Sequence, residues 1–160
     1  MDTYSCSKKV KAILIIITLA LVAFAFIHSS MPADISEEES GNVLEFLEKF
    51  LSFIGFTPGL TDHIVRKTAH FSEYTAIGAM LMSCAFAFDK LKPYKYYINV
   101  MFCGLATAVC DETIQLNVEG RAGMITDVLL DFSGVIFSTL IMLFIFLIYK
   151  KRFIAKSENK

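Results

Sequence analysis

The sequence is poor in charged residues, glycine and proline. Only 19% of its 160 residues are charged, against about 25% in an average soluble domain, whereas 55% are hydrophobic. Three prolines and eight glycines are too few for a fibrous or low-complexity chain. A net charge of -1 gives no reason to expect nucleic acid as a partner. The four cysteines form no CxxC pair, and the length excludes a large multi-domain enzyme.

Four apolar runs are each long enough to be read as a membrane span, which takes about 20 residues. They are apolar on every face, unlike the helices of a soluble core. The runs lie at about residues 12–27, 64–88, 96–118 and 126–149. The sequence therefore predicts an all-α integral membrane protein, with a bundle of four transmembrane helices in a single domain over residues 1–160. The first run also resembles a signal peptide, but we favour an uncleaved helix.

The distribution of lysine and arginine predicts the orientation of the spans. If the N-terminus is cytoplasmic, 11 of the 15 Lys and Arg residues fall on the cytoplasmic side and 4 on the opposite side. Both termini are therefore expected inside, in a multi-pass protein of the bilayer. Tyr94, Tyr96 and Tyr97 lie where an aromatic belt is expected at the interface.

A second helical pattern occupies the only long connection, residues 29–63. An apolar stripe with helical spacing predicts an extracytoplasmic amphipathic helix at about 42–54, between spans 1 and 2. Asn42 with Glu45 resembles a capping box, and the acidic run 37–39 is interpreted as a solvated face. The helix either lies in the outer interface or caps the bundle as a lid. Because its polar face is acidic, we favour packing onto the bundle. The stripe consists of Val43, Leu44, Leu47, Phe50, Leu51 and Ile54.

Ionisable residues inside the spans gather near one end. Charges in spans are costly and usually face the bundle interior. Counting about 1.5 Å per residue from Tyr96 puts Asp111 roughly 22 Å up a core about 30 Å thick, and Glu73 and Asp131 come out at a similar depth. Three helices are thus predicted to build one outward-facing polar site. Its members are Arg66, Lys67, His70, Glu73 and Tyr74 of the second span, Asp111, Glu112 and Gln115 of the third, and Arg121, Asp127 and Asp131 at the fourth.

Two stretches of this cluster resemble the signatures of the VanZ-like membrane proteins. The first is Arg66-Lys67-Thr68-Ala69-His70-Phe71-Ser72-Glu73-Tyr74, followed by Gly78. The second is Asp111-Glu112-Thr113-Ile114-Gln115, then Arg121, Asp127-Val128 and Asp131 with Gly134. Position 131 is often Asn in that pattern and is Asp here. The resemblance implies a bacterial plasma-membrane protein of the cell envelope. The family's namesake is associated with resistance to the glycopeptide antibiotic teicoplanin in Gram-positive bacteria.

Three classes of function stay open at this point. In a binding module, Arg66, Lys67 and Arg121 would hold an anionic lipid or a lipid-linked cell-wall precursor by its head group, with Tyr74, Gln115 and Asp131 beside it. In the second class, an intramembrane enzyme, a divalent-metal site or acid/base pair would be built from His70, Glu73, Asp111, Glu112 and Asp127. The third class is a structural network or helper subunit, in which the bases only neutralise the acids.

Overall fold

The computed structural model describes residues 5–55 and 59–158, with side chains to Lys151. All regular elements in this part of the chain are helical, as the sequence predicts. The elements are α1 (Lys8–Ser29), α2 (Ala33–Phe53), α3 (Asp62–Phe88), the 3-10 helix η1 (Pro93–Tyr96), α4 (Tyr97–Gln115) and α5 (Ile125–Glu158). Hydroxyl caps start two of them: Ser7 accepts the N–H of Val10 in α1, and Thr61 accepts the N–H of Ile64 in α3.

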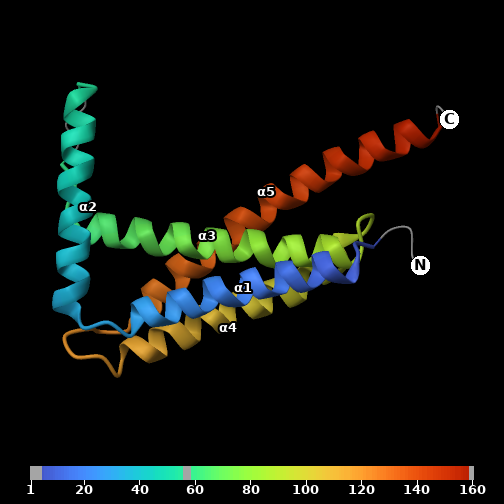
Figure 1. Cartoon of the computed structure of the whole chain (residues 1–160). Coiled ribbons are helices and arrows are strands. Elements are labelled where there is room, and N and C mark those ends of the chain that lie inside the picture. The colour runs from blue at the N-terminus through green and yellow to red at the C-terminus, as the bar shows by residue number, and fades with distance from the viewer. Residues whose placement is uncertain (1–4, 56–58, 159–160) are drawn as a thin grey trace.

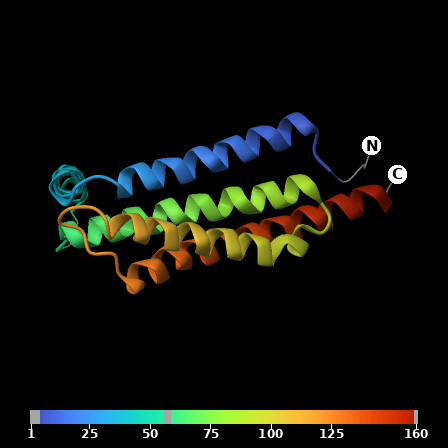
Figure 2. The ribbon, with the colours of Figure 1, turned by 90° about the horizontal axis from the view of Figure 1, so that it is seen from below.

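Four of the helices, α1, α3, α4 and α5, form the bundle (Figure 1). Helix α3 is its centre and contacts each of the other three. Helix α1 begins and α5 ends at the same end of the bundle, and α2 crosses the opposite end, where Figure 2 shows it end-on.

Three helices of the described chain are long and apolar enough to span a membrane: Lys8–Ser29, Asp62–Phe88 and Ile125–Lys151. The protein is thus a multi-pass membrane protein. Helix α4 is not one of the three, because Asp111, Glu112 and Gln115 lower the hydropathy of its last turns. Basic residues end the apolar part of α5 but not the helix, which continues to Glu158.

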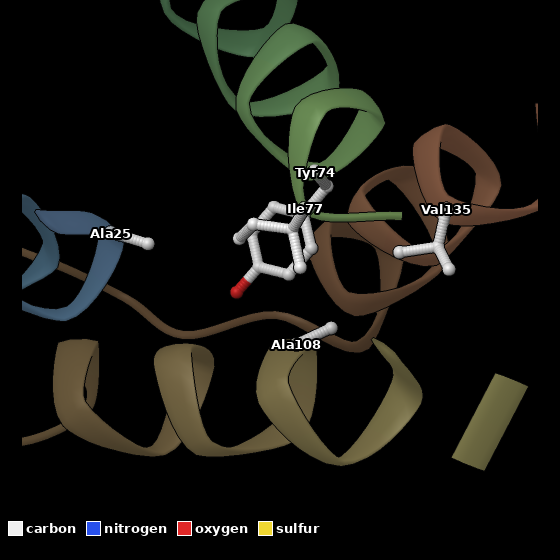
Figure 3. Packing of buried hydrophobic residues seen from close by; sticks show 5 residues of the cluster. All are labelled: Ala25, Tyr74, Ile77, Ala108 and Val135. Carbon is white, nitrogen blue, oxygen red and sulfur yellow. The ribbon is translucent and has the colours of Figure 1, made fainter. Parts of the chain in front are cut away.

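Small residues let α3 and α5 approach closely. A Cβ built on Gly134 would lie 2.6 Å from the carbonyl oxygen of Phe71, and one on Gly78 would lie 2.8 Å from the Cα of Val135. Small residues at helix crossings are typical of membrane bundles. Around this crossing Tyr74 and Val135 pack in a fully buried apolar cluster that reaches α1 and α4 (Figure 3).

Helix α2 begins nine residues before the predicted start, at Ala33. Asn42 is therefore an interior residue and not a cap, so the capping-box prediction is wrong. The helix starts instead after Pro32, whose fixed φ suits a helix start, and the N–H of Ala33 donates to the carbonyl of Glu119, 3.3 Å away. Residues 37–39 lie inside the helix and are exposed, and two of them, Glu37 and Glu39, lie close to Arg66 and His28 of the bundle.

The apolar stripe of α2 does not pack onto the bundle as expected. The residues that α2 buries are Ser36 and Ser40, in its first half. Beyond Gly41, which faces Asp62 at the start of α3, the helix extends past the bundle (Figure 1). Of the stripe, Phe50 and Ile54 are 55% and 60% exposed there, and the leucines of the stripe are half-buried. Only the first half of α2 therefore covers the end of the bundle.

Candidate functional site

A cavity of about 280 Å³ lies between α2 and the polar end of the bundle. Helices α3, α4 and α5, the loop between α4 and α5, and the start of α2 all contribute to its wall. Eight of the eleven predicted site residues line it: Arg66, Lys67, His70, Glu112, Gln115, Arg121, Asp127 and Asp131. Such a concave site with converging polar groups is the usual form of a ligand pocket.

The loop between α4 and α5 folds back toward α2 to complete the wall. Gly120 has a φ of 76°, a left-handed conformation that glycine adopts without a steric penalty. Its missing side chain also leaves room for Ala33, whose Cβ would be 2.9 Å from a Cβ at this position. The next residue, Arg121, then donates from Nη2 to the carbonyl oxygen of His28 over 3.3 Å.

Among the described residues, one lysine or arginine of the cavity forms an ion pair with an acid of the predicted cluster. Lys67 forms an ion pair with Asp127. Arg66 instead reaches Glu37 of α2, with 4.0 Å between Nη1 and Oε1. Burial, and then repulsion from Arg66, lower the pKa of Arg121 from its ordinary value. Arg121 forms no ion pair with another described residue, which favours an added anion at its guanidinium group.

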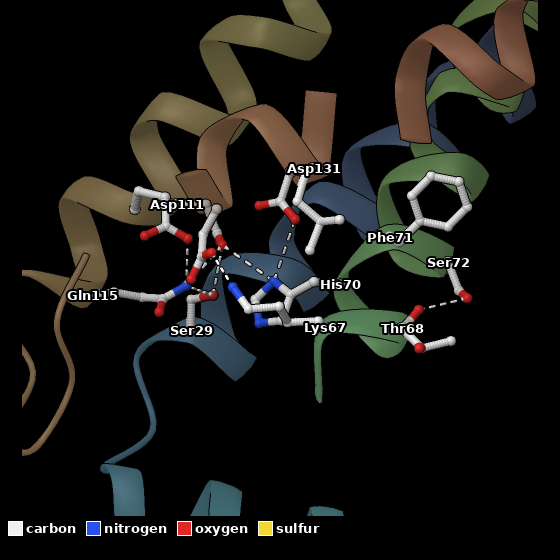
Figure 4. Close-up of polar contacts among 12 residues, drawn as sticks. Ser29, Lys67, Thr68, His70, Phe71, Ser72, Asp111, Gln115 and Asp131 are labelled. Atoms are coloured by element: carbon white, nitrogen blue, oxygen red, sulfur yellow. Dashed lines mark hydrogen bonds and ion pairs between the residues drawn. The ribbon is translucent and has the colours of Figure 1, made fainter. Parts of the chain in front are cut away.

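Asp111 is fully buried at the floor of the site. Its Oδ2 accepts a hydrogen bond from the Ser29 hydroxyl over 2.8 Å and another from the Gln115 amide over 3.3 Å. Its Oδ1 has no hydrogen-bond partner among the described residues. The carboxylate is therefore oriented by neutral donors from α1 and α4, with one oxygen left over (Figure 4).

Asp131 is also fully buried, and both of its oxygens lack a hydrogen-bond partner in the described part of the chain. The imidazole of His70 faces both aspartates: its Nδ1 lies 3.7 Å from Asp131 Oδ1 and 4.0 Å from Asp111 Oδ2. Figure 4 shows both contacts to the imidazole. Three helices thus bring an imidazole and two carboxylates together at one buried point.

Glu112 has a different environment from Asp111, its neighbour in the sequence. One of its oxygens accepts the backbone N–H of Met124 over 3.0 Å, and the other accepts the amide of Gln115 over 3.2 Å. The bond from Met124 joins the end of α4 to the residue that precedes α5. Glu112 therefore positions the α4–α5 connection as well as lining the cavity.

Three predicted site residues do not line the cavity: Glu73, Tyr74 and Asp111. Tyr74 belongs to the apolar cluster at the α3–α5 crossing, and its hydroxyl has no hydrogen-bond partner among the described residues. Glu73 is half-buried, and its Oε1 is likewise without a partner there. The structure thus places Asp111 behind the lining and Tyr74 in the core.

Sequence reasoning missed the groups that α1 and α2 supply. Ser29 bonds Asp111, and His28 lies 3.4 Å from Glu39, measured from Nε2 to Oε2. Glu37 faces Arg66. Ser29 and His28 end an otherwise apolar run at the same side as the cluster, which was the signal that could have identified them.

These features define a class: a multi-pass, all-helical membrane protein with a polar cavity at one end of its bundle. The family model VanZ/LLP1 matches residues 14–148. The chain therefore belongs to the VanZ/LLP1 family, as the resemblance of its two signatures predicts. Neither the curated proteins nor the solved structures contain a match to it.

Proposed function

We propose that this protein is a four-span plasma-membrane protein of the bacterial cell envelope that binds an anionic head group in a site opening to the outer face. Helix α4 is the additional span. Its 19 residues measure about 28 Å, close to the hydrocarbon thickness of about 30 Å. It lies antiparallel beside α3 and contacts α1 and α5 as well. The excess of lysine at the opposite end of the bundle supports cytoplasmic termini.

The exposed half of α2 supports this placement. Helix α2 lies across the bundle (Figure 1), so in the membrane it runs parallel to the surface. Ser36 and Ser40 are buried against the bundle, and past Gly41 the same face of α2 carries the apolar stripe. In Figure 1, this second half of α2 extends beyond the helices of the bundle. A helix of this form buries its apolar side among the lipid head groups. The cavity beside it is then at the level where lipid head groups lie.

The ligand class follows from the charges around the cavity. Arg66 and Arg121 line it, and Lys67 stands beside them. Guanidinium groups bind phosphate through two parallel hydrogen bonds. The site therefore suits the phosphate of an anionic lipid or of a lipid-linked cell-wall precursor. The observation that carries the proposal is this pair of arginines in a head-group-sized cavity at one end of a membrane bundle.

Binding can be measured on the full chain in nanodiscs of uncharged phosphatidylcholine. The probes are a short-chain phosphatidylglycerol, farnesyl diphosphate and inorganic phosphate, which separate a glycerolipid, an isoprenoid-linked head group and free phosphate. Arg66→Gln and Arg121→Gln should each weaken binding of the preferred probe by about 10- to 100-fold, since a hydrogen bond to a charged group contributes about 1.5–3 kcal/mol.

Lys49→Gln is the matched control, because Lys49 is an exposed cation of α2 that pairs only with Glu45. It should bind like the wild type. If the arginine variants bind all three probes normally but melt at lower temperature, the cluster is a structural network and the proposal is wrong.

In the cell, the proposed consequence is altered susceptibility to teicoplanin-type glycopeptides, because such drugs act at lipid-linked wall precursors. Expression in a susceptible Gram-positive host should raise the inhibitory concentration of teicoplanin, and Arg121→Gln should abolish the change at equal membrane abundance. An unchanged inhibitory concentration with the wild-type chain would remove this part of the proposal.

A further inference from the structure

We propose that His70, Asp111 and Asp131 form a binding site for one divalent metal ion of the Zn²⁺ or Mn²⁺ class at the floor of the cavity. These residues come from α3, α4 and α5, and each offers one ligand atom, with all three atoms within 4.8 Å of one another. The trio shares His70 and Asp111 with the divalent-metal site or acid/base pair that sequence analysis suggests, and Asp131 replaces the other acids of that set. All three residues belong to the predicted polar site, but no spacing in the sequence selects them as one trio.

The distances fit a metal centre after small adjustments. Zinc binds nitrogen and oxygen ligands at about 2.0–2.2 Å, so tetrahedral ligand atoms lie about 3.3 Å apart. The imidazole nitrogen lies 3.7 Å from Asp131 Oδ1 and 4.0 Å from Asp111 Oδ2. Side-chain movements of about 1 Å would therefore bring the three atoms onto one ion.

The charge at this point favours a cation. Asp111 and Asp131 are both fully buried, and no lysine or arginine of the described chain forms an ion pair with either. Buried charges are normally paired or bound to a metal. A divalent ion would neutralise two carboxylates, which together have three oxygens without a hydrogen-bond partner among the described residues.

The surroundings resemble the outer shell of a metal site. Metal-binding carboxylates are usually held in place by hydrogen bonds from neighbouring groups. Ser29 and Gln115 both donate to Asp111 Oδ2, which fixes that carboxylate and leaves Oδ1 free. His70 and Asp131 also line the cavity, so the remaining coordination positions face it.

A metal with open positions on the cavity side would take a phosphate oxygen as a further ligand. This step rests on the proposed head-group function, whereas metal binding itself does not. Zn²⁺ and Mn²⁺ are the appropriate probes because imidazole suits zinc and carboxylates suit manganese. No lipid probe is needed, so failure of one proposal leaves the other testable.

The test uses the full chain in phosphatidylcholine nanodiscs, stripped with chelator and then equilibrated with Zn²⁺ or Mn²⁺ alone. Mass spectrometry of the metal should find one ion per chain in the wild type. Asp131→Asn and His70→Gln should weaken binding by at least about tenfold, the lower bound for loss of even an outer-shell partner. Asp127→Asn is the matched control, since that carboxylate lines the same cavity but pairs with Lys67.

A second measurement on the unaltered chain guards against variants that do not fold. The electron paramagnetic resonance spectrum of bound Mn²⁺ should show coupling to one imidazole nitrogen. The inference is overturned if the wild type binds neither ion stoichiometrically, if Asp127→Asn loses as much affinity as Asp131→Asn, or if bound Mn²⁺ shows no nitrogen coupling.

Discussion

The crossing of α3 and α5 leaves no room for a side chain at Gly134. We predict that Gly134→Ala destabilises the protein although alanine is the better helix former. The added Cβ would lie 2.6 Å from the Phe71 carbonyl oxygen and 3.1 Å from the backbone nitrogen of Thr75. An ordinary carbon–oxygen contact needs about 3.3 Å, so the two helices must separate by about 0.7 Å.

The distance by which α3 and α5 must move apart determines how much stability the Gly134→Ala variant loses. A gap of 0.5–1 Å removes about a quarter to a half of the attraction between packed atoms, and overpacking of a close-fitting site costs about 1–3 kcal/mol. The same displacement would move Asp131 of α5 away from His70 of α3, which now lie 3.7 Å apart. We therefore expect a loss of about 1–3 kcal/mol in the free energy of unfolding, together with weaker metal binding.

Unfolding of the purified chain in detergent micelles, followed by circular dichroism, measures the first effect. Gly59→Ala is the control, because nothing lies within 4 Å of a Cβ at that position, and it should change stability by less than about 0.5 kcal/mol. If Gly134→Ala unfolds at the same denaturant concentration as Gly59→Ala, the close crossing of α3 and α5 does not exist as described.

Two further predictions concern α1 and α2. Ser29→Ala removes a hydrogen-bond donor from buried Asp111 and should lower the free energy of unfolding by about 1–3 kcal/mol. It should also weaken metal binding by about 10- to 100-fold, with one ion still bound at saturation. Ser30→Ala changes an exposed hydroxyl and should have neither effect, so equal effects of the two variants would refute the role of Ser29. The chain has no tryptophan, so Phe50→Trp reports on α2 alone: its fluorescence should be quenched by lipids brominated near the head group, and emission typical of water with no quenching would place α2 outside the interface.

Much of the fold was predictable because apolar runs of membrane length have few alternatives. The starts of α1 and α3 depend on strong signals, the hydroxyl caps at Ser7 and Thr61. The change from apolar to basic residues after Tyr149 marks the end of the apolar part of α5 but not the end of the helix, which continues to Glu158. The start of α2 was not predictable from its stripe. Residues 33–41 carry little apolar periodicity, and their helix is fixed by tertiary contacts such as the bond from Ala33 to Glu119.

The sequence predicts which residues form the site better than it predicts which of those residues contact one another. Helical spacing places Arg66 and His70 on one face, and the structure has both at the cavity. Pairing depends on the rotation of each helix and on the loops. Asp111 and Glu112 are neighbours in sequence, yet one faces His70 and the other binds the N–H of Met124. No spacing rule distinguishes them.

The bundle is polar at one end only. Toward the other end, the space between the helices is filled by Met82, Ala85, Val100 and Phe146, with stacked rings of Phe86 and Phe146 alongside. An ion or sugar that enters the cavity beside Arg121 therefore meets packed apolar side chains and finds no continuous polar path through the described part of the bundle. A solute bound in the cavity would therefore have to leave by the mouth through which it arrived.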